Sequence, residues 1–133
     1  MLLGQVYQSV GSWQKLAAIN MKPKLAYKIL KYVKLVFAEQ EIIEKQRVAL
    51  IREITGTKDG EDAKIEPNTP EFIQYMNRFN EVLVTETTLG QCDSYFDEVM
   101  DAVDEKNESL TVTDLAMLEP FFKSPDLRKI REP

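Results

Sequence analysis

Apolar residues recur at helical spacing along most of the first 84 residues of the chain. Between residues 5 and 19 they fall on one face at intervals of three and four, which predicts a first helix. From Lys24 to Ile54 neither proline nor glycine interrupts a sequence rich in good helix formers, and Pro23 suits a first helical turn. We therefore predict a second, long helix over residues 23–54.

The long helix carries an apolar seam that repeats every seven residues. The seam residues are Ile29, Val36, Ile43 and Leu50. This period is typical of helices that pack lengthwise against a partner. It fits a core helix of a compact bundle, and it also fits a seam used for self-association. A homo-oligomer is accordingly expected.

A third helix is predicted over residues 70–84. Thr69 and Asn68 offer capping side chains, Pro70 suits a first turn, and Glu71 is favoured there by the helix dipole. We expect this helix to fold back along the long one as an antiparallel helix hairpin.

The C-terminal third leaves two interpretations open. Residues 93–103 place apolar side chains on one helical face, which favours a helix, and a short β-hairpin in this region is the alternative. Thr113 is expected to cap a final short helix. The predicted fold is mainly α, a long helix plus an antiparallel helix hairpin with short flanking helices. Residues 1–122 would form a single helical domain and residues 123–133 a charged tail.

The residue types that are missing restrict the chemistry. The chain has no histidine and one cysteine, Cys92, so it cannot build a Cys-His nucleophile or a tetrahedral zinc site within one copy. Carboxylate-based catalysis and the binding of a hard cation stay open on these residues. We nevertheless expect no enzyme activity, no metal and no cofactor, because the sequence contains no Gly-rich phosphate loop, nucleophile elbow or dinucleotide-binding motif. A single cysteine fits a reducing compartment, and neither a secretory signal nor an apolar run long enough to span a membrane is evident.

Charge is distributed unevenly along the chain. Residues 1–60 hold ten Lys/Arg against five Asp/Glu, whereas residues 61–133 hold seven against seventeen. Four aspartates recur at helical spacing in the acidic half and are predicted to bind another protein: Asp93, Asp97, Asp101 and Asp104. A solvated helix face is the simpler interpretation of the same residues. The run lacks the alternation and the central glycine of a calcium loop.

The basic half contains a candidate anion-binding stripe at the start of the long helix. Its residues are Lys24, Tyr27, Lys28 and Lys31, with Tyr32 close by. The lysines recur one helical turn apart, so a phosphorylated ligand could lie along them, although lysines on a wet helix face are the simpler interpretation. Nucleic acid is not expected as a partner, because a protein with a pI near 4.9 lacks a general basic footprint.

Several stretches together resemble a family of short proteins encoded by tailed phages and prophages of Gram-positive bacteria, a family with no known function. They are residues 15–31, the end of the long helix near 52–53, the loop at 58–60, and residues 79–83 and 110–119. The likeness covers residues 13 to 122. It implies a phage gene product that acts in the cytoplasm of the host bacterium or is built into the virion.

These observations lead to one leading hypothesis of function and two alternatives. The leading hypothesis is a non-enzymatic phage accessory protein that binds another protein stoichiometrically and inhibits a host or anti-phage defence factor. The first alternative is a virion or assembly component, since a long seam and segregated charge suit symmetric packing. The second is a sponge that sequesters a nucleotide signal.

Overall fold

The computed structural model of the chain describes residues 1–57, 64–104 and 110–124. The chain divides into two compact units. Unit 1 contains residues 1–7 and 38–87, and unit 2 contains residues 8–37 and the segment from residue 88 onward. Most of the predicted tail, residues 125–133, lies outside the described residues.

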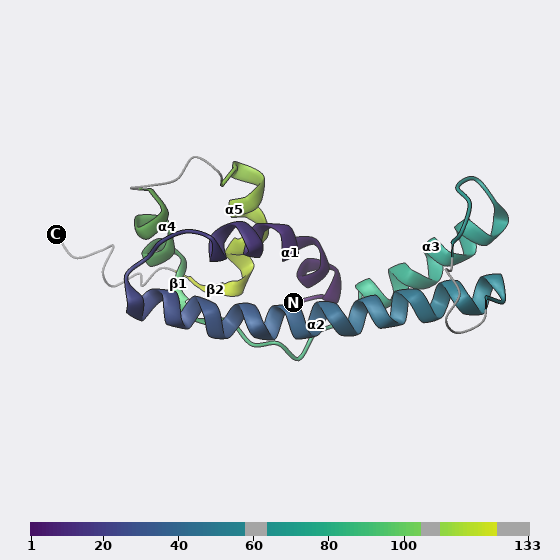
Figure 1. Cartoon of the computed structure of the whole chain (residues 1–133), viewed down its shortest axis with the longest axis horizontal. Coiled ribbons are helices and arrows are strands. Elements are labelled where there is room, and N and C mark those ends of the chain that lie inside the picture. The colour runs from purple at the N-terminus through teal and green to yellow at the C-terminus, as the bar shows by residue number, and fades with distance from the viewer. Residues whose placement is uncertain (58–63, 105–109, 125–133) are drawn as a thin grey trace. The chain divides into compact units, whose positions relative to one another are not determined.

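The described part of the chain is mainly α-helical, as predicted, with one small sheet (Figure 1). In chain order the elements are α1 Leu3–Ala17, α2 Pro23–Thr55, α3 Pro70–Leu83, β1 Cys92–Tyr95, α4 Phe96–Asp104, α5 Val112–Leu118, the 3₁₀ turn Glu119–Phe121 and β2 Phe122–Lys123. No helix of the described residues is long and apolar enough to cross a lipid bilayer.

Helix α2 confirms the predicted long helix to within one residue. It starts at Pro23, and it ends at Thr55 because Gly56 adopts a left-handed φ of 71°, a conformation that glycine reaches without steric cost. The four seam residues, which recur every seven positions, are all buried within the chain. The seam therefore serves intramolecular packing.

Unit 1 is organised around the second half of α2. Its buried cluster is Ile43, Leu50 and Phe79, so that α3 packs against α2 through apolar side chains. An ion pair of 3.1 Å between Arg78 and Glu53 lies at the edge of this packing. Helix α3 begins where the sequence predicts, because the Thr69 side chain accepts a hydrogen bond of 3.2 Å from the Phe72 N–H and Pro70 occupies the first turn.

The first residues of the chain complete unit 1. The Leu3 N–H donates to the Thr85 carbonyl at 2.8 Å and the Thr87 N–H to the Met1 carbonyl at 2.9 Å, which forms a short antiparallel bridge. A Cβ atom at Gly4 would lie 3.0 Å from the Leu83 carbonyl oxygen, so this close approach favours glycine.

Unit 2 is built around Trp13, which is fully buried on α1. Its ring lies 5.3 Å from that of Tyr32 on α2, 5.5 Å from that of Phe121 and 5.4 Å from that of Phe122, measured between centroids. The Tyr32 hydroxyl donates to the Gly90 carbonyl at 2.6 Å. This aromatic core therefore joins α1, α2 and the end of the described chain.

The C-terminal third contains the predicted helix from Phe96 onward and, before it, a strand of a small sheet that neither interpretation included. Strands β1 and β2 are parallel, with Cys92 opposite Phe122, so the alternative of a β-hairpin is wrong. A hairpin joins strands adjacent in sequence, whereas α4 and α5 separate these two. Residues 92–95 form β1, where buried and exposed side chains alternate, and the predicted helix starts only at Phe96.

The final helix is capped two residues earlier than predicted. Thr111, not Thr113, is the N-cap of α5, because its side chain accepts a hydrogen bond from the Asp114 N–H. The Asp114 carboxylate in turn accepts one from the Thr111 N–H. This reciprocal pair is a capping box.

Candidate functional site

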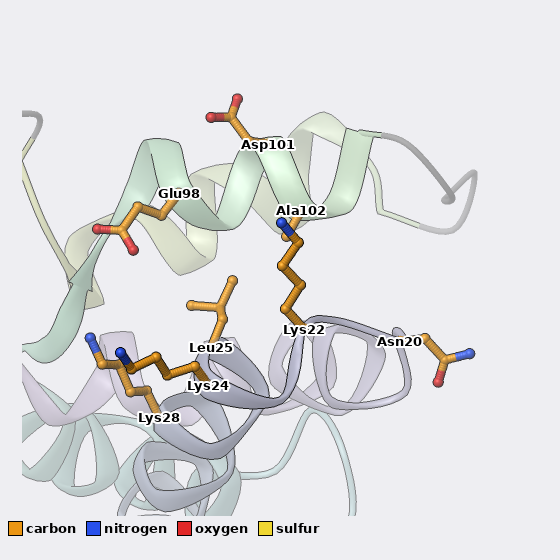
Figure 2. Close-up of a pocket in the computed structure, with 8 residues that line it drawn as sticks. All are labelled: Asn20, Lys22, Lys24, Leu25, Lys28, Glu98, Asp101 and Ala102. Carbon is orange, nitrogen blue, oxygen red and sulfur yellow. The ribbon is translucent and has the colours of Figure 1, made fainter.

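A cleft of about 460 Å³ in unit 2 lies between the start of α2 and helix α4 (Figure 2). It is lined by Asn20, Lys22, Lys24, Leu25, Lys28, Glu98, Asp101 and Ala102. In Figure 2, Lys22 and Leu25 extend toward α4, and Lys24 and Lys28 direct their ammonium groups to the same side of the cleft. Glu98 comes from α4 on that side, whereas the Asp101 carboxylate points away from α2.

The basic wall of this cleft contains two residues of the predicted anion-binding stripe. Lys24 and Lys28 are exposed and lie one turn apart on α2. Among the described residues, no ion pair holds Lys22, Lys24 or Lys28. The two like charges therefore repel each other without a carboxylate bound between them.

The other two residues of the stripe lie outside the lining of the cleft. Tyr27 is 62% exposed, and the Lys31 ammonium lies 5.4 Å from the centroid of its ring, which is a cation–π contact. Tyr32 is buried in the aromatic core, and this burial raises its pKa. Tyr32 is therefore not available to stack on a ligand.

The four predicted protein-binding aspartates do not share one helix. Asp93 lies on β1, where its carboxylate accepts a hydrogen bond of 2.6 Å from Lys123 on β2. The pKa of Asp93 is lowered by this hydrogen bond, by the charge of Lys123 and, further, by the charge of Lys28. Asp97 and Asp101 are exposed on α4, and Asp104 ends that helix, with a side chain outside the described residues.

Glu98 and Lys22 line the cleft but were not singled out from the sequence. Glu98 follows Asp97 directly and appeared to be one more acid of a charged segment. Lys22 lies in the turn before α2. Its place in the cleft depends on where α4 packs, and helical spacing carries no such information.

A second polar site that the sequence did not indicate surrounds Asp114. Its carboxylate, only 7% exposed as a residue, accepts hydrogen bonds from the Ser12 hydroxyl at 2.7 Å, the Lys15 ammonium at 2.9 Å and the Thr111 N–H at 3.0 Å. The Thr111 N–H, Ser12 and Lys15 hold the pKa of Asp114 well below its usual range. Because Ser12 and Lys15 join α1 to α5 and Thr111 caps α5, we interpret this network as structural.

Two further findings concern reactive groups of the described residues. Cys92 is buried, and burial raises the pKa of its thiol, so the reactive thiolate is disfavoured. Within residues 1–57, 64–104 and 110–124, no group of three or more His, Cys, Asp or Glu side chains could hold a metal ion.

Comparison of the chain with protein families, with curated proteins and with solved structures finds no match.

Proposed function

We propose that the protein is a non-enzymatic phage accessory factor that binds another protein stoichiometrically and thereby inhibits a host or anti-phage defence factor. The observation that carries the proposal is the outward face of α4. Asp97 and Asp101 are both exposed there, one turn apart, and α4 contains no basic residue. No ion pair of the described residues holds either aspartate.

The placement of Asp101 is unfavourable for the helix itself, whereas Asp97 lies in the first turn, where the helix dipole favours an acid. A helix carries a partial negative charge at its C-terminus, and acidic groups in its second half weaken it. Asp101 lies in the second half of α4, and no basic residue occupies the last turn. A basic partner surface would offset this repulsion, and the field of the two carboxylates would accelerate its approach.

The kind of partner follows from this chemistry. Exposed carboxylates one turn apart can each accept hydrogen bonds from arginine or lysine, so the partner should offer a basic patch. Covering that patch would block whatever anionic group the partner normally binds. In the phage context implied by the sequence resemblance, this occlusion would protect the phage inside its host.

The test compares two variants that lose the same charge. One is Asp97→Asn with Asp101→Asn, and the control is Glu71→Gln with Glu81→Gln on α3, where both acids are exposed. Each tagged protein would be used for affinity purification from phage-infected Gram-positive cells at several salt concentrations. We expect one host protein that the original chain and the control retain, that the aspartate variant loses, and that dissociates as salt is raised.

Two results would contradict the proposal. Retention of the same protein by the aspartate variant would show that α4 is not the contact. Recovery of the chain at a fixed copy number in purified phage particles, without a host partner, would favour the virion component instead.

A further inference from the structure

The first half of α2 carries charge in an arrangement that weakens the helix. Its lysines are Lys24, Lys28, Lys31 and Lys34, and no acid occurs between residues 24 and 38. Positive charge near a helix N-terminus opposes the helix dipole, and lysines three or four residues apart repel each other. The second half of α2 is different, because Glu41 lies 4.0 Å from Lys45 and Glu44 lies 3.0 Å from Arg47.

Three lysines near the start of α2 gather at the cleft without an ion pair among the described residues, although Lys28 also interacts with Asp93 through its charge. Lys24 and Lys28 line the cleft together with Lys22, and Leu25 and Ala102 supply apolar surface between its walls. Glu98 faces the two α2 lysines from α4 in Figure 2. The cleft thus presents a cationic wall opposite Glu98, with apolar surface between them, while the carboxylate of its second acidic residue, Asp101, points away from α2.

We propose that this cleft binds a small phosphate ester that also carries a protonated amine, such as an amino sugar phosphate. The phosphate would lie against Lys24 and Lys28, because a dianion removes the repulsion between these two groups. The amine would donate to Glu98. A simple anion without a donor would leave Glu98 unpaired beside negative charge.

Size and lining narrow the ligand class further. A cleft of about 460 Å³ is within the range of small-molecule sites, which is roughly 300 to 1,000 Å³. No aromatic side chain lines it, so a nucleobase would find no stacking partner. A sugar-sized ligand fits better than a nucleotide.

The side chains that this ligand would contact differ from those of the proposed protein contact. The protein contact uses the exposed carboxylates of Asp97 and Asp101. Asp101 also lines the cleft, but its carboxylate points away from α2, whereas the ligand would use Lys24, Lys28 and Glu98. Ligand binding can therefore be present or absent whether or not a protein partner exists.

The experiment measures the affinity of the whole chain for two probes by calorimetry at constant ionic strength. The probes are glucosamine 6-phosphate and glucose 6-phosphate, which differ in the amine. We expect the amine to improve affinity about tenfold, the value of one charge-assisted hydrogen bond. The double variant Lys24→Gln with Lys28→Gln should bind both probes with an affinity at least about tenfold lower.

Two further variants assign the effects to the cleft. Glu98→Gln should remove the preference for the amine and leave glucose 6-phosphate at least as tightly bound. The matched control, Lys31→Gln with Lys34→Gln, loses the same charge from the same helix outside the lining and should preserve the preference. Equal affinity of the original chain for the two probes, or undiminished binding by the Lys24 and Lys28 variant, would overturn the proposal.

Discussion

The two units of this chain build their cores in different ways. In unit 1, Ile43 and Leu50 come from one helix and Phe79 from the next helix in sequence, all at helical spacing. In unit 2, Trp13 meets Tyr32, Phe121 and Phe122, which come from segments up to about a hundred residues apart. A core of neighbouring helices can be predicted from periodicity, whereas a core of distant segments depends on tertiary packing.

The polar networks of the two units also differ in whether they join distant segments or neighbouring residues, and in how deeply they are buried. Asp114 in unit 2 is nearly buried and joins α5 to α1 through Ser12 and Lys15. Glu44 in unit 1 binds Arg47, three residues along the same helix, and accepts from the Tyr7 hydroxyl at 3.1 Å, with about a third of both charged side chains exposed. Burial makes the first network important for stability, and solvent weakens the second.

The largest expected effect breaks the aromatic core of unit 2. Trp13→Ala removes a side chain that is 0% exposed and contacts three rings, so the free energy of unfolding should fall by about 4–5 kcal/mol. Phe79→Ala in unit 1, at 7% exposure, should cost about 3 kcal/mol. Chemical denaturation followed by far-ultraviolet circular dichroism measures both, and a larger loss for Phe79→Ala would contradict the ranking.

A smaller effect appears in the pH dependence of unit 2. The folded state lowers the pKa of Asp114 below its unfolded value of about 3.9, so the carboxylate stabilises the fold above that pH and loses this contribution as pH falls through 4 toward the folded pKa. Asp114→Asn should therefore cost about 2 kcal/mol at pH 7 and progressively less below pH 4. Denaturant titrations between pH 7 and pH 2.5 measure the difference.

The Asp114 experiment has its own control. Lys15→Gln removes only the donor that is about half exposed and keeps the Thr111 and Ser12 hydrogen bonds, so most of the pH dependence should persist. If the free energy of unfolding of the original chain and that of Asp114→Asn differed by the same amount across this pH range, Asp114 would not be the group that titrates.

The smallest expected effect concerns the network of unit 1. Glu44→Gln should reduce the free energy of unfolding by no more than about 1 kcal/mol, because the pair with Arg47 is partly solvated and formed within one helix. The hydrogen bond from Arg47 lowers the pKa of Glu44, so this contribution also weakens in acid. Raising salt should shrink the effect, and a loss as large as that of Asp114→Asn would remove the contrast between the two networks.

Local sequence by itself determined the helices of the first 84 residues. The long helix between Pro23 and Gly56 and the start of α3 at Thr69 were predictable, because periodicity, proline, glycine and capping side chains act within a few residues. The lysines one turn apart on α2 were predictable for the same reason.

Tertiary structure alone decided the sheet and the opposite wall of the cleft. The pairing of Cys92 with Phe122 and the ion pair between Asp93 and Lys123 join segments thirty residues apart, so no local pattern encodes them. Asp93 consequently lies on β1 and not on the predicted acidic helix, and Glu98 faces Lys24 and Lys28 across the cleft. Such contacts depend on which buried surfaces fit together across the whole unit, and that information is spread over many residues.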